Sequence, residues 1–166
     1  MRSKALFAVL STIVLVLVVV VTAEAQLPKS GTVKLHSGWK GVGDIREVGK
    51  DHLYWEGTFY GMWFNDENRG FLHLAHWVCA GITDIKDGRQ TLNAFCTATD
   101  RDGDQITTLA KGRGAEGGFD DVGMHSLTGG TGKYAGIEGT ITWRCYATAK
   151  HAQFSCWHDG NYRLPS

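Results

Sequence analysis

His52–Phe64 reads HLYWEGTFYGMWF, and this stretch decides the fold class. It is rich in aromatic residues, which favour strands, and large and small side chains alternate along it with the period of two that a strand requires. The interiors of small β-barrels often show this alternation. The stretch therefore predicts a strand whose inward face consists of Trp55, Gly57, Phe59, Gly61 and Trp63.

The opposite face of this strand is not plainly a solvent face, because it consists of Tyr54, Glu56, Thr58, Tyr60 and Met62. Two interpretations of the strand are open. In the first, one face is a packed core and the other is a contact between subunits. In the second, the inward face lines a pocket for an apolar ligand, and its three large rings are ligand-binding residues.

Short β-rich runs separated by Gly and Asp continue on both sides of this strand. Asn65–Asn68, Asp87–Gly88 and Asp100–Asp104 have the composition of turns, and Gly112–Gly123 has that of a loop. About eight short strands in consecutive hairpins indicate a β-sandwich or a β-barrel. The other predicted strands are Thr32–Trp39, Gly70–Ile85, Thr91–Thr99, Gln105–Lys111, Met124–Thr128, Thr140–Ala149 and Gln153–Tyr162.

The N-terminus has the pattern of a secretory signal peptide. Arg2 and Lys4 precede an apolar run over Ala5–Val21, and Ala23–Ala25 forms a small-x-small cleavage site. We expect cleavage after Ala25 and a secreted or periplasmic protein with no membrane attachment; the alternative is an uncleaved membrane anchor. Residues 26–166 then form a single domain.

The charge balance limits the partners. The chain has 17 Lys and Arg against 17 Asp and Glu among 166 residues, so its formal net charge is zero. A basic surface able to hold a phosphate backbone is not expected, and nucleic acid is an unfavoured partner. With 43% hydrophobic residues, the chain is able to bury a core.

The four cysteines form two pairs, each symmetric about a predicted turn, at Asp87–Gly88 and at residues 150 and 151. Residues symmetric about a hairpin turn face each other across the strands, which brings directly opposed Cα atoms within disulfide reach. A zinc site built from all four cysteines is the alternative. It is disfavoured because there is no C-x2-C pair and the expected compartment is oxidising. The predicted disulfides are Cys79–Cys96 and Cys145–Cys156.

Residues 126–139, SLTGGTGKYAGIEG, resemble the GGTG-x-[FY] segment of the allene oxide cyclase and dirigent protein superfamily. The resemblance extends over the following pair of strands and the closing segment Trp157–Pro165. The turn Asp100–Asp104 is similar to one in small exported bacterial proteins of this type. Several glycines in such a segment permit positive φ and close backbone approach, and Tyr134 supplies an aromatic ring at the end of the barrel.

This resemblance implies an all-β, eight-stranded antiparallel up-and-down barrel with an apolar cavity. Members are often oligomeric, so a homo-oligomer is expected. Relatives steer reactive hydrophobic small molecules without a redox cofactor. The implied partner is therefore a hydrophobic small molecule, and no cofactor is expected.

Three residues are candidates for acid–base catalysis. His73 and His76 form an H-x-x-H pattern, and on a strand these two side chains point to opposite faces, so a zinc pair is disfavoured and one of them is expected in the cavity. Trp77 shares parity with His73 and is a candidate ligand contact, as is Tyr134. Glu56 lies among aromatic residues that would raise the pKa of a buried carboxyl, although an exposed or paired Glu is favoured.

No metal site is expected. The Asp100–Asp104 turn lacks the twelve-residue frame and the distal Glu of a calcium loop. The predicted function is that of a cofactor-free cyclase, isomerase or lyase, acting by positioning and acid–base catalysis. The alternatives are a non-catalytic carrier of an apolar ligand and a structural protein with a filled core. A titratable side chain in an open cavity would favour the enzyme.

Overall fold

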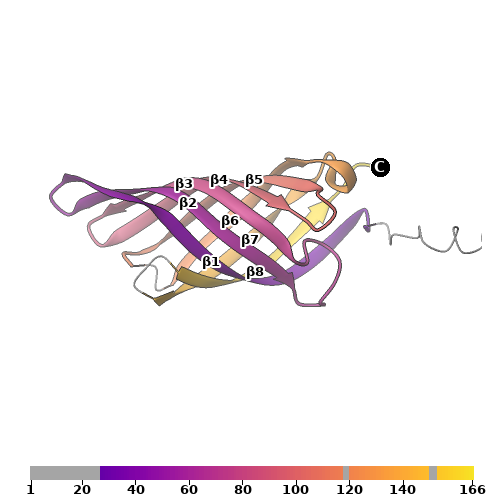
Figure 1. Ribbon diagram of the computed structural model, residues 1–166, viewed down its shortest axis with the longest axis horizontal. Helices are drawn as coiled ribbons and strands as arrows, with labels where there is room; N and C mark the ends of the chain where they lie inside the picture. The colour runs from indigo at the N-terminus through magenta and orange to yellow at the C-terminus, as the bar shows by residue number, and fades with distance from the viewer. Residues whose placement is uncertain (1–26, 118–119, 150–152) are drawn as a thin grey trace, which may run out of the picture.

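A computed structural model describes residues 27–117, 120–149 and 153–166; the predicted signal segment 1–25 lies outside them. In the described residues eight antiparallel strands form one closed barrel, in which each strand pairs with the next and the last pairs with the first (Figure 1). The strands are β1 (Ser30–Gly49), β2 (His52–Asn65), β3 (Ala75–Lys86), β4 (Arg89–Thr99), β5 (Gln105–Ala115), β6 (Asp121–Gly130), β7 (Glu138–Ala149) and β8 (Gln153–Arg163). The predicted up-and-down barrel is confirmed.

Both predicted disulfides are present, and they confirm the register of two hairpins. Cys79 lies opposite Cys96 across β3 and β4, with Cα atoms 4.0 Å apart. Cys145 lies opposite Cys156 across β7 and β8, with Cα atoms 4.1 Å apart. The bridges tie neighbouring strands of the barrel wall together.

The strand predicted over Gly70–Ile85 is wrong at its start, because β3 begins at Ala75. Gly70, Leu72 and Leu74 have positive φ values of 79°, 52° and 60°, which an extended strand does not allow. Residues 71–74 therefore form turns, and His73 lies outside the strand.

The loop predicted over Gly112–Gly123 is also wrong at both ends, because β5 continues to Ala115 and β6 begins at Asp121. The glycines here have a packing role. The Trp143 ring lies 2.3 Å from an ideal Cβ on Gly112 and 2.1 Å from one on Gly123, so a larger residue at either position would displace the indole. The strand β1 likewise runs to Gly49, ten residues beyond its predicted end.

One end of the barrel is closed by aromatic rings. Phe71, from the β2–β3 connection, stacks on Tyr162 with ring centroids 4.3 Å apart and meets Tyr134 edge-on at 5.9 Å. Tyr134 belongs to the short 3-10 helix η2 (Gly132–Tyr134), and burial raises the pKa of its phenol. In Figure 1 this is the end near the C-terminus. The predicted aromatic plug at the barrel end is confirmed.

The middle of the barrel holds a layer of tryptophans. Trp63 on β2 and Trp77 on β3 are fully buried and stack with ring centroids 4.1 Å apart. The inward face predicted for β2 is confirmed, because the Trp39 ring lies 2.5 Å from an ideal Cβ on Gly61 and so uses the space that a side chain there would fill. Beyond this layer, toward the β1–β2 and β3–β4 hairpins, the barrel is hollow.

A cavity lined by aromatic rings, with a polar floor

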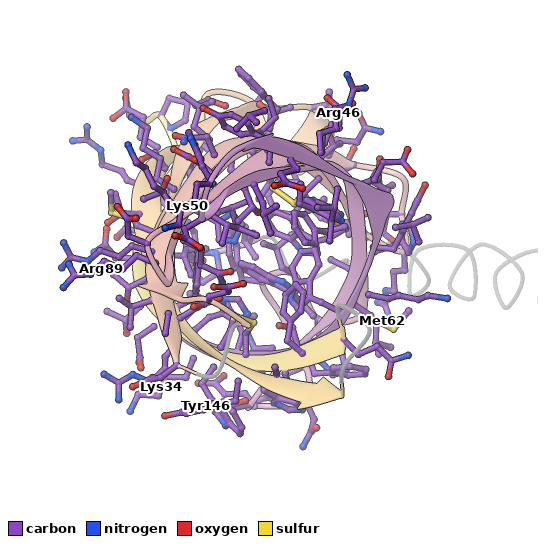
Figure 2. All side chains as sticks on the ribbon, turned by 90° about the vertical axis from the view of Figure 1, so that its left-hand side faces the viewer. Lys34, Arg46, Lys50, Met62, Arg89 and Tyr146 are labelled. Carbon is purple, nitrogen blue, oxygen red and sulfur yellow. A yellow bond between two sulfur atoms is a disulfide. The ribbon has the colours of Figure 1, made fainter. Side chains whose placement is uncertain are left out.

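The hollow half of the barrel is a cavity of about 840 Å³, within the range typical of small-molecule sites. It reaches the surface, because Ile45 lines it and is 64% exposed. Figure 2 views the barrel from this end, and Arg46 and Arg89 point away from the ring of strands. The wall is mainly apolar and includes both disulfides and the rings of Trp39, Trp55, Phe59, Trp143 and Phe154.

Two histidines form the polar part of the floor. His125 on β6 is 4% exposed and His158 on β8 is 2% exposed, and both line the cavity. The tryptophan layer lies against them: the Trp63 ring centroid is 4.1 Å from that of His158, and the Trp77 centroid is 5.2 Å from that of His125. The two imidazoles therefore reach the apolar space from β6 and β8, which β7 separates, and their ring centroids are 6.2 Å apart.

Burial keeps both imidazoles neutral near physiological pH. Burial lowers the pKa of His125 to about 3. It also lowers the pKa of His158 well below the usual value of 6.5, and the nearby His125 and His36 lower it further. A neutral imidazole has one donor and one acceptor nitrogen, so each ring supplies hydrogen bonds rather than charge.

Hydroxyl groups hold the two rings in place. The Nε1–H of Trp39 donates to Ser37 Oγ at 2.7 Å, and Ser37 Oγ is also hydrogen-bonded to His158 Nε2 at 2.7 Å. On the other side, Thr108 Oγ1 is hydrogen-bonded to His125 Nδ1 at 3.0 Å. Each imidazole therefore has one nitrogen fixed by the protein, which orients the ring.

The rim of the cavity carries a half-buried carboxyl. Asp121 accepts a hydrogen bond from the Gln90 side-chain amide, and both residues line the cavity. Burial raises the pKa of Asp121, the Gln90 hydrogen bond opposes this, and the neighbouring Asp120 raises it further. Arg113 is the other charged residue among the described lining residues.

Comparison with known proteins identifies the architecture. No family model and no curated protein sequence matches the chain. Among solved structures, the pterocarpan synthase dirigent protein PsPTS1 aligns with 85% of this chain and 99% of its own length, with a TM-score of 0.53 and 14% identity. A second pterocarpan synthase dirigent protein, GePTS1, aligns with 83% and 87%, with a TM-score of 0.52 and 13% identity. The protein has the dirigent-like β-barrel fold.

This dirigent-like barrel places two of the predicted ligand contacts, Trp55 and Phe59, in the cavity wall, where their ring centroids are 4.5 Å apart. Trp63 and Trp77 lie in the layer beneath the floor. Tyr134 does not line the cavity, because it belongs to the aromatic plug at the opposite end of the barrel.

The expectation that His73 or His76 reaches the cavity is wrong. His76 is exposed, because it has the outward parity of β3 while Trp77 points inward. His73 is half-buried in the turn before β3, where its Nδ1 accepts a hydrogen bond of 3.2 Å from the Asn65 backbone N–H. The expectation that His73 and Trp77 lie on the same face of one strand is therefore wrong, because His73 lies outside the strand.

Glu56 is also outside the cavity of the dirigent-like barrel. It forms an ion pair with Arg46 on the outer surface, and its side chain is 46% exposed. The interpretation as a paired surface carboxylate is therefore confirmed.

Sequence reasoning missed His125 and His158, although a signal for His158 was available. His158 is two residues from Cys156 and shares its strand face, so the disulfide register links the two orientations. His125 shares a face with Leu127 in β6. The sequence pattern does not show whether that face points into the barrel or outward. A shift of the strand register by one residue would move every side chain of the strand to the opposite face.

The described residues contain no group of three or more His, Cys, Asp or Glu side chains suited to a metal ion. Within the same part of the chain, no helix has the length and apolar character needed to cross a membrane. The two disulfides favour an oxidising environment outside the cytosol.

Proposed function

We propose that this dirigent-like barrel binds an apolar small molecule and promotes its cyclisation, isomerisation or cleavage without a cofactor, as a cyclase, isomerase or lyase. The observation that carries the proposal is the pair of buried histidines at the floor of an otherwise apolar cavity. A structural protein with a filled core would have no cavity. A carrier that binds its ligand by apolar contacts alone would not require buried histidines in the cavity. The sequence-based criterion for an enzyme, a titratable group in an open cavity, is met by His125 and His158.

The apolar wall would contribute by positioning. Rings from β1, β2 and β8 surround the space, with the Trp39 and Phe154 centroids 6.3 Å apart and those of Phe59 and Phe154 5.7 Å apart. Such a wall excludes water and restricts an apolar ligand to few orientations, which is a large source of rate acceleration for intramolecular reactions. Cyclisation and isomerisation are reactions of that kind.

The histidines would contribute hydrogen bonding and proton transfer. Each neutral ring is able to accept a proton at one nitrogen and donate one at the other. A base with a pKa of about 3, as at His125, is weak, so the proton-transfer share of the rate is expected at the low end of the ~10²–10⁴-fold usual for a positioned acid or base.

The test uses a substrate-independent proton-transfer assay. The probe is 6-phenyl-1-tetralone, an apolar ketone whose α-protons exchange with D2O, and exchange is followed by ¹H NMR with and without the protein. We expect the protein to accelerate exchange and His158→Phe and His125→Leu to remove the acceleration. The exposed histidine variant His76→Gln, outside the cavity, is the matched control and should keep it. Binding of the ketone without any acceleration would contradict the enzyme and leave the carrier.

The second candidate function, a carrier of an apolar ligand, is favoured by the low basicity of His125. A carrier needs only the wall and a hydrogen-bonding floor. In that case His158→Phe would change the affinity for the ketone, measured by calorimetry, while no variant would change the exchange rate.

We also propose that the barrel acts after export, as a secreted or periplasmic protein released from residues 1–25. The two disulfides support an oxidising destination. N-terminal sequencing of the exported protein should begin at Gln26. A sequence that begins at Met1 would contradict cleavage and favour the uncleaved anchor.

A further inference from the structure

Trp157 on the outer face of β8 is a tryptophan that the fold leaves in water. All six tryptophans of the chain are among the described residues, and the other five are buried or half-buried, whereas Trp157 is 55% exposed. Its outward direction is fixed, because it alternates along the strand with the buried residues Cys156 and His158. Phe95, another strongly exposed ring, is on β4 and therefore belongs to a different part of the wall.

Trp157 is part of a band of aromatic rings across four strands. The Tyr146 ring on β7 meets it edge-on, with the ring centroids 5.8 Å apart. On the other side, His36 on β1 lies directly opposite Trp157, and the His36 ring stacks on Phe64 of β2 at 5.3 Å. We call Tyr146, Trp157, His36 and Phe64 the aromatic band. Because its rings come from adjacent strands, Trp157 is not one of the singly scattered surface apolar residues that need no explanation.

Polar side chains surround Trp157 on the outer wall. Its partners across the strands are His36 and Arg144. Its neighbours on the same face of β8 are Ser155 and Asp159. Groups that donate and accept hydrogen bonds therefore border the indole along the strand as well as across it.

Two charged groups beside the ring have no partner. Asp159 lies directly opposite Lys34, yet neither side chain has an ion pair or a hydrogen bond within the described part of the chain. Lys34 and Tyr146 both lie outside the ring of strands in Figure 2. Arg144, in contrast, is paired with Asp120 at 3.6 Å. The surface thus offers a free cation and a free acceptor, while its charges are balanced.

A polar surface groove adjoins this part of the wall. It has a volume of about 970 Å³ and lies between the start of β1, the end of β8 and the connection from β2 to β3. Lys34 and Asp159 line it, together with Asp66 and Asn161. Asp66 is also hydrogen-bonded to His36 at 2.7 Å, so the groove and the aromatic band form one continuous surface.

The mixture of rings and charges selects the kind of ligand. The core of a protein contact is depleted of charged residues, and a helix or sheet that lies on a membrane presents an apolar face. A phosphate backbone would be repelled by Asp66 and Asp159. A sugar matches both features, because a pyranose has a face of C–H groups that packs on an aromatic ring and a rim of hydroxyl groups that donate and accept hydrogen bonds.

We propose that the aromatic band and the adjoining groove bind an uncharged glycan of β-linked pyranose units, with one sugar ring stacked on Trp157 and its hydroxyl groups hydrogen-bonded to Asp159 and Lys34. The glycan is uncharged because the charges of the surface are balanced. It is β-linked because equatorial linkages and hydroxyl groups leave flat C–H faces for the indole to contact. The site is on the outside of the wall, so it goes beyond the proposed function of the cavity and does not depend on it.

Calorimetry with two β-linked hexasaccharides tests the site. Cellohexaose carries hydroxyl groups alone and chitohexaose adds an N-acetyl group to each ring, so the pair distinguishes two sources of such a glycan. The purified protein should bind at least one of them. Trp157→Ala should weaken that binding about tenfold, the loss expected for one aromatic stacking contact. Trp157→Phe keeps a ring and should retain most of the affinity.

Further variants and a spectroscopic signal locate the sugar. Asp159→Ala should weaken binding a few-fold, because it removes an acceptor beside the ring. The matched control Phe95→Ala removes an exposed ring from β4 and should leave binding unchanged. In ¹H–¹⁵N NMR, the indole signal of Trp157 should shift with the hexasaccharide, and that of Trp55 in the cavity should not. The substituted side chains are all exposed, and thermal unfolding checks that each variant is folded.

The outcomes separate this inference from the proposed function. Binding of neither hexasaccharide would overturn the glycan site, and so would equal affinity of the wild-type protein and Trp157→Ala. A shift of the Trp55 signal in place of the Trp157 signal would put the sugar in the cavity and overturn the outer site. The ketone assay reports on the cavity alone, so either proposal is able to fail while the other stands.

Discussion

Trp55 and Trp63 lie on the same face of β2, yet they have different surroundings. Trp63 is fully buried between Trp77 and His158, while Trp55 lines the cavity and is only partly buried. Trp63→Ala should therefore lower the free energy of unfolding by about 3–5 kcal/mol, as for other buried aromatic residues. Trp55→Ala should lower it by less than about half of that and weaken binding of the apolar ketone instead. Urea unfolding and calorimetry measure the two effects, and an equal loss of stability in both variants would contradict a ligand-lining role for Trp55.

Trp55 and Trp63 also show how much of a single side chain's surroundings the sequence predicts. Alternation with glycine correctly predicted that both rings point inward, because a large ring needs the space that a neighbouring glycine leaves. It could not separate the wall of a cavity from a packed core. That difference depends on how far each position lies from the closed end, and hence on Phe71 and Tyr134, which belong to other segments.

At the scale of the strand, the two disulfides act on separate hairpins, β3–β4 and β7–β8. The Cys79–Cys96 bridge closes a separation of 17 residues and Cys145–Cys156 one of 11. In the chain-entropy description, replacing either pair by alanine should lower the free energy of unfolding by about 2–3 kcal/mol, with a loss about 0.4 kcal/mol larger for the first pair. Urea denaturation of the two double variants measures this. Unchanged stability in both would show that the bridges do not restrict the unfolded chain.

The hairpins also show where sequence reasoning works for elements and where it fails. Asp87–Gly88 and the cysteine symmetry fixed the β3–β4 register correctly, because turn chemistry and covalent geometry are local. The sequence analysis assigned Gly112 and Gly123 to a loop. The ring that packs on them belongs to Trp143 in β7, and a rule based on neighbouring residues in the sequence does not include such a distant contact. The catalytic assignments to His76 and Glu56 are wrong for a related reason, because a local pattern sets the alternation of side chains and not which face points inward. His73 is outside the cavity because the positive φ values of its neighbours delay the start of β3.

For the whole molecule, the neutral histidines of the floor predict acid sensitivity. The unfolded chain binds a proton at His125 below about pH 6.5, whereas the folded protein does not until about pH 3. The stability contributed by the neutral ring is therefore complete above pH 6.5 and decreases as the pH falls toward 3, by on the order of 5 kcal/mol for this residue. His158 acts in the same direction.

Thermal unfolding between pH 7.5 and 4 measures this effect. The Tm of the wild-type protein should fall with pH, and His125→Asn should flatten the decrease. The control His76→Gln changes an exposed histidine on the outer face of β3, away from the floor, and should leave the slope unchanged. A Tm that is constant over this range would contradict a neutral buried His125.

The outer wall of the barrel supports the expected homo-oligomer, which stays a prediction. Phe95 on β4 is 75% exposed and lies opposite Leu109 on β5, while Val78 on β3 lies opposite Tyr60 on β2, and all four are exposed on one side of the barrel. Contiguous exposed apolar groups of this kind mark contact surfaces. This is also the strand face for which the sequence left a subunit contact open.

We therefore expect the purified protein to self-associate through the outer faces of β2 to β5. Light scattering coupled to gel filtration should give a mass that is a multiple of one chain, and Phe95→Glu should reduce it to that of one chain, because a charge at the centre of an apolar contact lacks a partner. The control Trp157→Glu places the same charge on the outer face of β8, where Trp157 is 55% exposed, and should leave the assembly intact. A single-chain mass for the wild-type protein would contradict the oligomer. An assembly that survives Phe95→Glu would place the contact elsewhere on the wall.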